Sequence, residues 1–253
     1  MLPFPAETSR KLKFDFINEI KNKLLEKYDK DIEAISIYGS VAQGKEGPYS
    51  DIELHIISRD GVNIPTYELI LHPFKLEIST KQKSEWFHQA SVVDDGWALR
   101  AGSFVHITPL YDPNGVFSKA KEIALSVSDE RFRGVIAEFM IWEPYETMGK
   151  IRNAKASNNL SYLPRAVFDL TWQTAKLIGL MNKQYYSSRA VTLEESIEKP
   201  IKPKGYVELA TKVISGELAD KEELYLLCEN LWCGLNSLLE DLRIEYRSDV
   251  LDL

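Results

Sequence analysis

The sequence has few of the residues that build disulfide frameworks or zinc sites. Its 253 residues include two cysteines, Cys228 and Cys233, and four histidines. Five positions of a helix turn the chain by about 500°, so the two thiols are expected on different faces and no disulfide is predicted. The histidines occur singly, without the HExxH or C2H2 spacings. Metalloprotease and zinc-finger chemistry are therefore excluded.

Long apolar runs and an excess of basic residues are also absent. No stretch reaches the ~20 apolar residues of a membrane span, and residues 1–5 have neither region of a signal peptide. We therefore expect a cytoplasmic protein. Lys and Arg number 31 against 38 Asp and Glu, which leaves a net charge of −7. Because clustered cations supply nucleic-acid affinity, this balance argues against a nucleic-acid partner and leaves a cationic one open.

The first hundred residues mix helix and strand. Apolar residues recur every four positions from Leu12 to Tyr28, which predicts an amphipathic helix over Thr8–Tyr28. Its lysines, Lys13 among them, are interleaved with acidic residues and are expected on a solvated face. Short apolar or alternating segments predict strands at 34–38, 51–57, 67–71 and 74–79, the last two joined by a His-Pro turn.

The pattern becomes helical after Pro113. Helical periodicity covers 115–126, 129–153, 163–182, 206–215 and 220–246. We predict an α+β protein, with a mixed-sheet domain at residues 1–113 and an all-helical up-and-down bundle at residues 114–253. The last segment carries a leucine stripe from Leu224 to Leu242. The stripe spans under three heptads, which favours intramolecular packing over a coiled-coil dimer seam.

The most informative motif joins a glycine turn to a carboxylate pair. Gly39-Ser40 follows the first predicted strand, and Asp51 and Glu53 stand at i and i+2 of the next. Such a pair projects from one face of a strand and suits a hard cation such as Mg²⁺. A Gly-Ser turn offers backbone N–H groups and a hydroxyl to a phosphate. The combination predicts a metal-dependent enzyme of phosphoryl-group chemistry. Asp29-x-Asp31 and Asp31-x-Glu33 repeat the tripeptide without the turn.

Two further residues extend this site. Glu77 alternates with apolar neighbours on the strand expected beside Asp51, and it faces either the cleft or solvent. His55 continues the face of Glu53, where packing at the edge of the site is favoured over metal ligation.

A second constellation lies in the segment 129–153. Glu143, Glu146 and Lys150 share one helix face at i, i+3 and i+7. Glu-Lys pairs of this spacing are commonplace on surfaces. Here, however, the surrounding stretch is the most apolar of the helix, and Pro144 removes one N–H and predicts a kink. The pattern therefore favours charges that face a pocket, with a carboxylate able to act as a general base.

These motifs resemble the DNA polymerase β-like nucleotidyltransferase superfamily and, more narrowly, the 4′ aminoglycoside (kanamycin) nucleotidyltransferase family. The similar segments are Ile37–Ser40, Gly47–Glu53, Lys75–Glu77, Pro109–Asp112 and Glu146–Asn153, and the likeness extends over the chain. The resemblance implies a cytoplasmic antibiotic-resistance enzyme that transfers AMP from MgATP, or another nucleoside triphosphate, to the 4′-hydroxyl of kanamycin-type aminoglycosides. It also implies a homodimer whose sites are lined by both subunits.

The resemblance further implies a role for each matching residue. Asp51 and Glu53 would hold Mg²⁺, and Gly39 and Ser40 would contact the triphosphate. Glu146 would be the base, with Lys150 steadying the α-phosphate or the drug. Glu68, Glu77, Glu143 and Glu146 would face the drug's ammonium groups. The sequence departs from the family at Gln43, Trp142 and Pro144.

Two alternatives are weighed against this function. A nucleotidyltransferase acting on tRNA or another nucleic acid would need a basic groove, which the charge balance does not supply. A catalytically inactive nucleotidyltransferase-like binding module would usually have lost a metal carboxylate, and both Asp51 and Glu53 are present.

Overall fold

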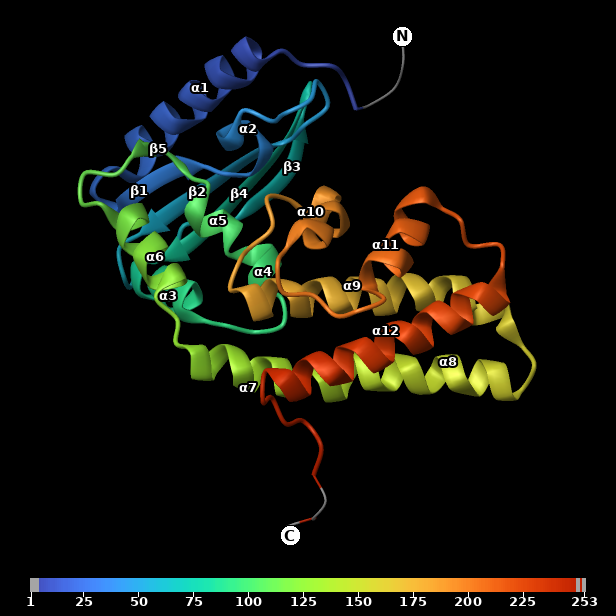
Figure 1. Ribbon diagram of the computed structural model, residues 1–253. Coiled ribbons are helices and arrows are strands. Elements are labelled where there is room, and N and C mark those ends of the chain that lie inside the picture. Colours follow the sequence, from blue (N-terminus) through green and yellow to red (C-terminus); the bar gives the residue numbers. More distant parts are fainter. Residues whose placement is uncertain (1–4, 249–250, 252–253) are drawn as a thin grey trace. The chain divides into compact units, whose positions relative to one another are not determined.

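The computed structural model describes residues 5–248 and 251, which form two compact units (Figure 1). The sheet unit comprises the described residues up to Val92 and Ala101–Val127, and the helical unit comprises Val93–Arg100 and the described residues from Ser128 onward. Residues 1–4, part of the segment that was expected to carry no leader, lie outside the described residues. The domain boundary at residue 113 stays a prediction, since these units are defined by their internal contacts.

The sheet unit contains five strands in the order β3-β4-β2-β1-β5. Their bounds are β1 (Ile32–Ile37), β2 (Ile52–Ser58), β3 (Tyr67–Leu71), β4 (Phe74–Gln82) and β5 (Thr108–Tyr111). Strands β2 and β4 pair in parallel and the other neighbours are antiparallel, so the predicted mixed sheet is confirmed. Strand β5 was not predicted. Its four residues include Pro109, which an edge strand tolerates.

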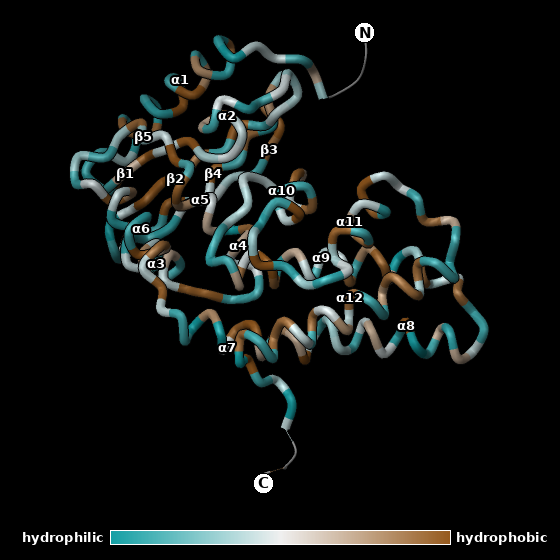
Figure 2. The backbone as a smooth tube through the Cα atoms, in the orientation of Figure 1, coloured by the Kyte–Doolittle hydropathy of each residue, from teal (hydrophilic) through white to brown (hydrophobic). Residues whose placement is uncertain are grey.

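Hydrophobic side chains cover both faces of this sheet. Alternation sends Ile35 and Ile37 to one face, where they pack with Ile17 of α1 (Arg10–Tyr28). Ala34 and Ile57 lie in a second cluster, with residues of α3 (Lys83–Ser91), α5 (Gly102–Val105) and α6 (Val116–Leu125). Strands β1 and β2 accordingly have much of the hydrophobic colour in Figure 2. The even-numbered positions of β2 fill the first cluster, which leaves Glu53 and His55 on the second face.

The helical unit is arranged around one buried helix, α9 (Leu163–Asn182), which contacts the other long helices of the unit. These are α7 (Asp129–Met140), α8 (Glu146–Ala156), α11 (Tyr206–Ser215) and α12 (Lys221–Asp241), with the shorter α4 (Trp97–Arg100) and α10 (Thr192–Glu198). The predicted helical half is thus confirmed, although the last helix ends at Asp241, before the expected Tyr246. None of the helices described could cross a membrane, given their lengths and polarity.

The leucine stripe packs inside the chain. Leu224, Cys228, Leu231 and Leu235 of α12 are fully buried, and the helix contacts α9, α11 and α8. The interpretation as intramolecular packing is therefore confirmed for this part of the stripe. Cys228 is buried and Cys233 is exposed, so the two thiols lie on different faces of the helix, as their spacing predicted.

Candidate functional site

A row of three glutamates crosses the sheet, with one from each of three adjacent strands. Glu53 of β2 is the register partner of Glu77 on β4, and Glu77 is also the partner of Glu68 on β3. Asp51 immediately precedes β2, on the same side as Glu53. Like charges on directly opposite residues repel, so this row is suited to a cationic ligand. The structure thus brings together four of the carboxylates named from the sequence.

Lys75 and Tyr38 form ion pairs and a hydrogen bond with these carboxylates. The ammonium of Lys75 lies 3.2 Å from a carboxylate oxygen of Asp51 and 3.2 Å from one of Glu68. These hydrogen bonds raise the pKa of Lys75. The hydroxyl of Tyr38 donates to Oε1 of Glu77 at 2.8 Å, and burial together with this bond raises the pKa of Tyr38. Glu77 therefore faces the site and not open solvent, which resolves the alternative that the sequence left open.

Glu53 is the carboxylate with the most perturbed acidity. Burial, followed by the charges of Asp51 and Glu77, raises its pKa from 4.5 to about 7, and Lys75 opposes this only in part. Its carboxylate lies directly over Gly39, where an added Cβ would be 1.6 Å from Oε2 of Glu53. Gly39 also has φ +67°, a conformation that favours glycine. Glycine is therefore required at position 39 for two reasons: the positive φ of its backbone, and the close approach of the Glu53 carboxylate.

The Gly-Ser motif begins a short helix, where the sequence predicted only a turn. Helix α2 (Gly39–Gln43) contains Ser40 in its first turn and contacts β2. In the described ranges no group of three His, Cys, Asp or Glu side chains is arranged to hold a metal ion. Asp51 and Glu53 offer a pair of hard oxygen donors, held close enough to raise the pKa of one of them. This donor set fits Mg²⁺, which keeps water or phosphate oxygens as its other ligands.

His55 packs beside the carboxylates. Its ring stacks on that of Tyr38 with centroids 3.7 Å apart, and a tilted contact to Trp86 closes its other side. Burial lowers the pKa of His55 to about 3, so the ring is neutral near pH 7. This geometry supports the packing interpretation over metal ligation.

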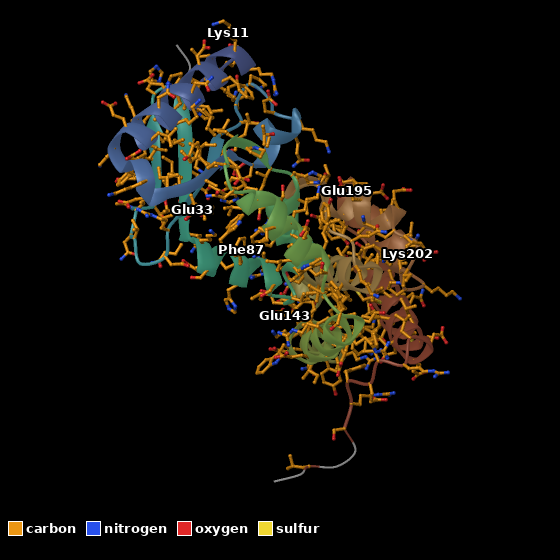
Figure 3. All side chains as sticks on the ribbon, turned by 90° about the vertical axis from the view of Figure 1, so that its left-hand side faces the viewer. Lys11, Glu33, Phe87, Glu143, Glu195 and Lys202 are labelled. Atoms are coloured by element: carbon orange, nitrogen blue, oxygen red, sulfur yellow. The ribbon has the colours of Figure 1, made fainter. Side chains whose placement is uncertain are left out.

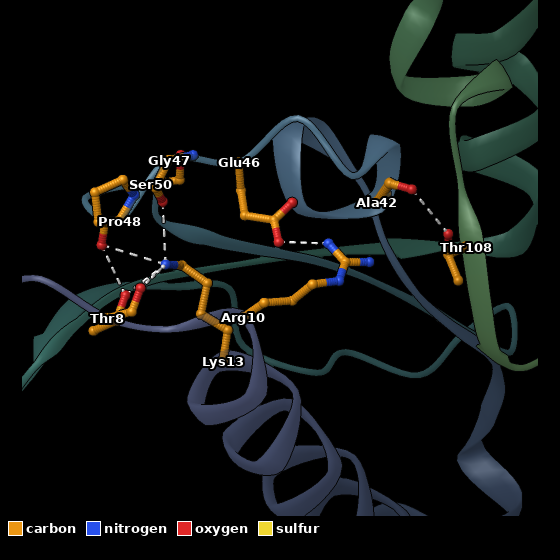
Figure 4. Close-up of polar contacts among 9 residues, drawn as sticks. All are labelled: Thr8, Arg10, Lys13, Ala42, Glu46, Gly47, Pro48, Ser50 and Thr108. Atoms are coloured by element: carbon orange, nitrogen blue, oxygen red, sulfur yellow. Dashed lines mark hydrogen bonds and ion pairs between the residues drawn. The ribbon is translucent and has the colours of Figure 1, made fainter.

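A buried lysine anchors the loop that leads to Asp51, and the sequence placed it wrongly on the solvated face of α1. Lys13 is fully buried, and its ammonium donates to Oγ1 of Thr8 at 2.5 Å, to the carbonyl of Gly47 at 3.3 Å and to that of Pro48 at 3.4 Å (Figure 4). The predicted stripe was off by one position here, since Leu12 is 44% exposed. The spacing of Lys13, Ile17 and Leu24 was the available signal.

Glu143, Glu146 and Lys150 lie in the helical unit. Glu146 and Lys150 form an ion pair at 2.8 Å, and both line a surface hollow of about 570 Å³ with Trp142 and Tyr145, whereas Glu143 lines a different hollow. Glu143, labelled in Figure 3, accepts a hydrogen bond from Nε2 of Gln173 at 2.8 Å.

Pro144 is accommodated without breaking the helix. Residues Ile141–Tyr145 form a π-helical turn between α7 and α8. Such a turn adds a residue to the helix and re-aims its side chains, and π turns are frequent at functional sites. The distortion that was expected at Pro144 is therefore a switch from α-helical to π-helical hydrogen bonding. Helix α8 begins directly after this turn, at Glu146.

Comparisons with known proteins agree with this architecture. The family model of the nucleotidyltransferase domain matches residues 17–96, and that of the KNTase C-terminal domain matches residues 114–245. A solved nucleotidyltransferase-like protein from Exiguobacterium sibiricum 255-15 has a TM-score of 0.56 at 14% identity, covering 91% of this chain and 81% of that one. This likeness concerns the fold alone.

Two curated relatives extend over almost the whole chain. Proteins named aminoglycoside nucleotidyltransferase (4′) from a Bacillus species and from Staphylococcus aureus are each 32% identical over 236 residues. The matches cover 93% of this chain and 93% of each relative.

Proposed function

The chain belongs to the aminoglycoside nucleotidyltransferase (4′) family, and on that premise we propose that it transfers AMP from MgATP to the 4′-hydroxyl of aminoglycosides of the kanamycin, tobramycin and amikacin type. Pyrophosphate is the second product, and the modified antibiotic no longer acts. The observation that carries the proposal is the carboxylate pair of Asp51 and Glu53, with Glu53 pressed against Gly39. Because ATP is available in the cytoplasm, we propose that the reaction takes place in the cytoplasm.

Asp51 and Glu53 are assigned to Mg²⁺, and Gly39 and Ser40 to the triphosphate. Asp51 and Glu53 would hold Mg²⁺, which would supply positive charge to neutralise the phosphate oxygens during attack on the α-phosphorus. Burial raises the pKa of Glu53 first, and the charges of Asp51 and Glu77 add to this; a cation bound there would stabilise the ionised carboxylate and relieve the repulsion, which supports the assignment. Gly39 leaves room for the Glu53 carboxylate, and the hydroxyl of Ser40 is a donor for a phosphate oxygen.

Glu146 is assigned as the general base that takes the proton of the sugar hydroxyl. It lines an open hollow, as a group that meets substrate must. Lys150, held by Glu146 at 2.8 Å, is assigned to the α-phosphate or the bound drug. General-base catalysis of this kind is typically worth 10²–10⁴-fold in rate.

Glu68, Glu77, Glu143 and Glu146 are assigned to the ammonium groups of the drug. A polycation is attracted by a carboxylate-lined site from which a nucleic acid is repelled, and the net charge of −7 supports this choice of partner. We further propose a homodimer in which each active site takes residues from both subunits. Light scattering tests the dimer, and a monomeric mass at working concentration argues against it.

The activity is tested by mass spectrometry of each aminoglycoside after incubation with the protein, Mg²⁺ and ATP, with NMR to locate the added AMP. We expect a gain of one AMP on the 4′-oxygen. Asp51→Asn and Glu53→Gln are expected to nearly abolish transfer while the chain stays folded. Asp29→Asn is the matched control, since it lies in the repeated D-x-D tripeptide without the glycine turn.

Glu146→Gln separates catalysis from binding. A base that acts in the transition state is expected to lose kcat, with little change in ATP affinity. A loss found mainly in the aminoglycoside KM would reassign Glu146 to drug binding. Near-normal turnover by Asp51→Asn or Glu53→Gln would refute the metal assignment, and transfer to RNA but to no amino sugar would refute the function.

A further inference from the structure

Trp142 is an exposed tryptophan at the junction of two hollows in the helical unit. Its side chain is 69% exposed, which is unusual for a residue of this size. It lies in the π-helical turn and lines the hollow that contains Glu146 and Lys150. It also lines a second hollow, of about 260 Å³. A ligand lying over the indole would therefore reach both hollows.

The second hollow is acidic. It is lined by Asp94, Asp95, Glu138 and Glu143, with Arg131 as the one cation among its lining residues. Asp94 is paired with Arg100 at 2.8 Å, and Asp95 is paired with Lys176. The side-chain carboxylate of Glu138 has no hydrogen bond or ion pair in the part of the chain that the structure describes, although its backbone carbonyl accepts from Ile141. Its carboxylate is thus available to a ligand.

A buried amide lies behind this hollow. Gln173 is 7% exposed and donates to Glu143 and to Oγ1 of Thr147 at 2.8 and 3.0 Å. Its own Oε1 is buried and has no hydrogen-bond partner among the described residues. The amide therefore holds Glu143, which lines the hollow, and Gln173 keeps one buried acceptor without a donor.

We propose that Trp142 is a platform for a sugar ring of the aminoglycoside away from the reacting hydroxyl, with one ammonium group of that ring in the acidic hollow. The inference rests on the proposed function and assigns Trp142 as a specificity-determining residue. An indole face attracts an ammonium group through its ring quadrupole, and the apolar C–H face of a sugar packs on it. The carboxylates of the acidic hollow attract the same ammonium group.

Charge decides between the two substrates that could stack on this indole. The base of a nucleotide also stacks on tryptophan, but its triphosphate would then be beside a hollow with more carboxylates than cations, where it is repelled. A polycationic amino sugar is attracted both by the Trp142 indole and by the carboxylates of the acidic hollow. Trp142 therefore selects the acceptor of the AMP group, and not the donor.

The test is Trp142→Ala, with Trp142→Phe and a matched control. Leu226→Ala truncates a side chain of similar exposure, 61%, that lines neither hollow. We expect Trp142→Ala to raise the aminoglycoside KM, and its Kd by calorimetry without ATP, at least tenfold, with KM for MgATP unchanged within twofold. Trp142→Phe should recover most of the affinity, and Leu226→Ala should match the unsubstituted chain.

Glu138→Gln tests the acidic hollow separately, with Glu130→Gln on the same helix as its control. We expect a severalfold weaker aminoglycoside Kd for Glu138→Gln only, and a smaller loss with amino sugars that carry fewer ammonium groups. An unchanged aminoglycoside Kd in Trp142→Ala, or a rise in KM for MgATP instead, would overturn the inference. If the unsubstituted protein neither binds nor adenylylates any aminoglycoside, the proposed function fails. If it transfers AMP normally and Trp142→Ala does so equally well, only the inference about Trp142 fails.

Discussion

Replacing Glu53 by glutamine should stabilise the protein while it abolishes activity. Burial, followed by repulsion from Asp51 and Glu77, raises the pKa of Glu53 from 4.5 to about 7. At ~1.4 kcal/mol per pH unit, ionising this carboxylate in the folded chain costs at most about 3–4 kcal/mol. The side chain is partly exposed, so screening by solvent lowers this to about 1–2 kcal/mol. Glutamine has nearly the same shape, carries no charge and can donate to the neighbouring carboxylates.

The pH dependence follows from the direction of the shift. Between pH 4.5 and about 7 the folded chain keeps a proton on Glu53 that the unfolded chain has lost. Folding stability from this group is therefore fully present below pH 4.5 and is lost as the pH rises through 7. The gain from Glu53→Gln should be absent at pH 4.5 and complete near pH 8.5.

The assay is thermal unfolding by calorimetry without divalent cations, at both pH values. For a chain of this size, about 1–2 kcal/mol corresponds to a rise in Tm of roughly 2–8 °C at pH 8.5. Added Mg²⁺ should raise the Tm of the unsubstituted protein and leave Glu53→Gln nearly unchanged. Glu68→Gln is the control, because that side chain is 66% exposed and paired with Lys75. A Tm of Glu53→Gln at or below that of the unsubstituted protein at pH 8.5 would refute the reasoning, as would an offset that persists at pH 4.5.

Three further predictions concern packing. Gly39→Ala should displace the Glu53 carboxylate and abolish nucleotidyl transfer while circular dichroism shows a folded chain, since the added Cβ lies 1.6 Å from Oε2; normal kinetics would contradict the close approach. Lys13→Met should lower the free energy of unfolding by about 1–3 kcal/mol in urea, because carbonyls of the 47–48 turn lose a buried donor, and no change would mean that the ammonium is not buried. Cys233 should react with a thiol reagent in the native state and Cys228 only after unfolding; equal rates would contradict the burial.

Local patterns predicted the regular elements well where period and boundary residues agreed. The segments 67–71, 163–182 and 206–215 were predicted with the bounds that β3, α9 and α11 have. Strand β5 was missed because four residues with a central proline carry almost no strand signal. Lys13 was misplaced because its charge outweighed its position in the buried stripe.

The sequence by itself determined the two-part α+β organisation, the carboxylate pair after the glycine motif and the one-face spacing of Glu146 and Lys150. All of these depend on short-range periodicity along the chain. Only the tertiary structure decided that Glu68, Glu77 and Glu53 form one row, because strand register depends on pairing between segments that are distant in sequence. It also decided the acidity of Glu53, which depends on burial and neighbouring charge, and the contribution of Trp142 to two hollows, which no local pattern contains.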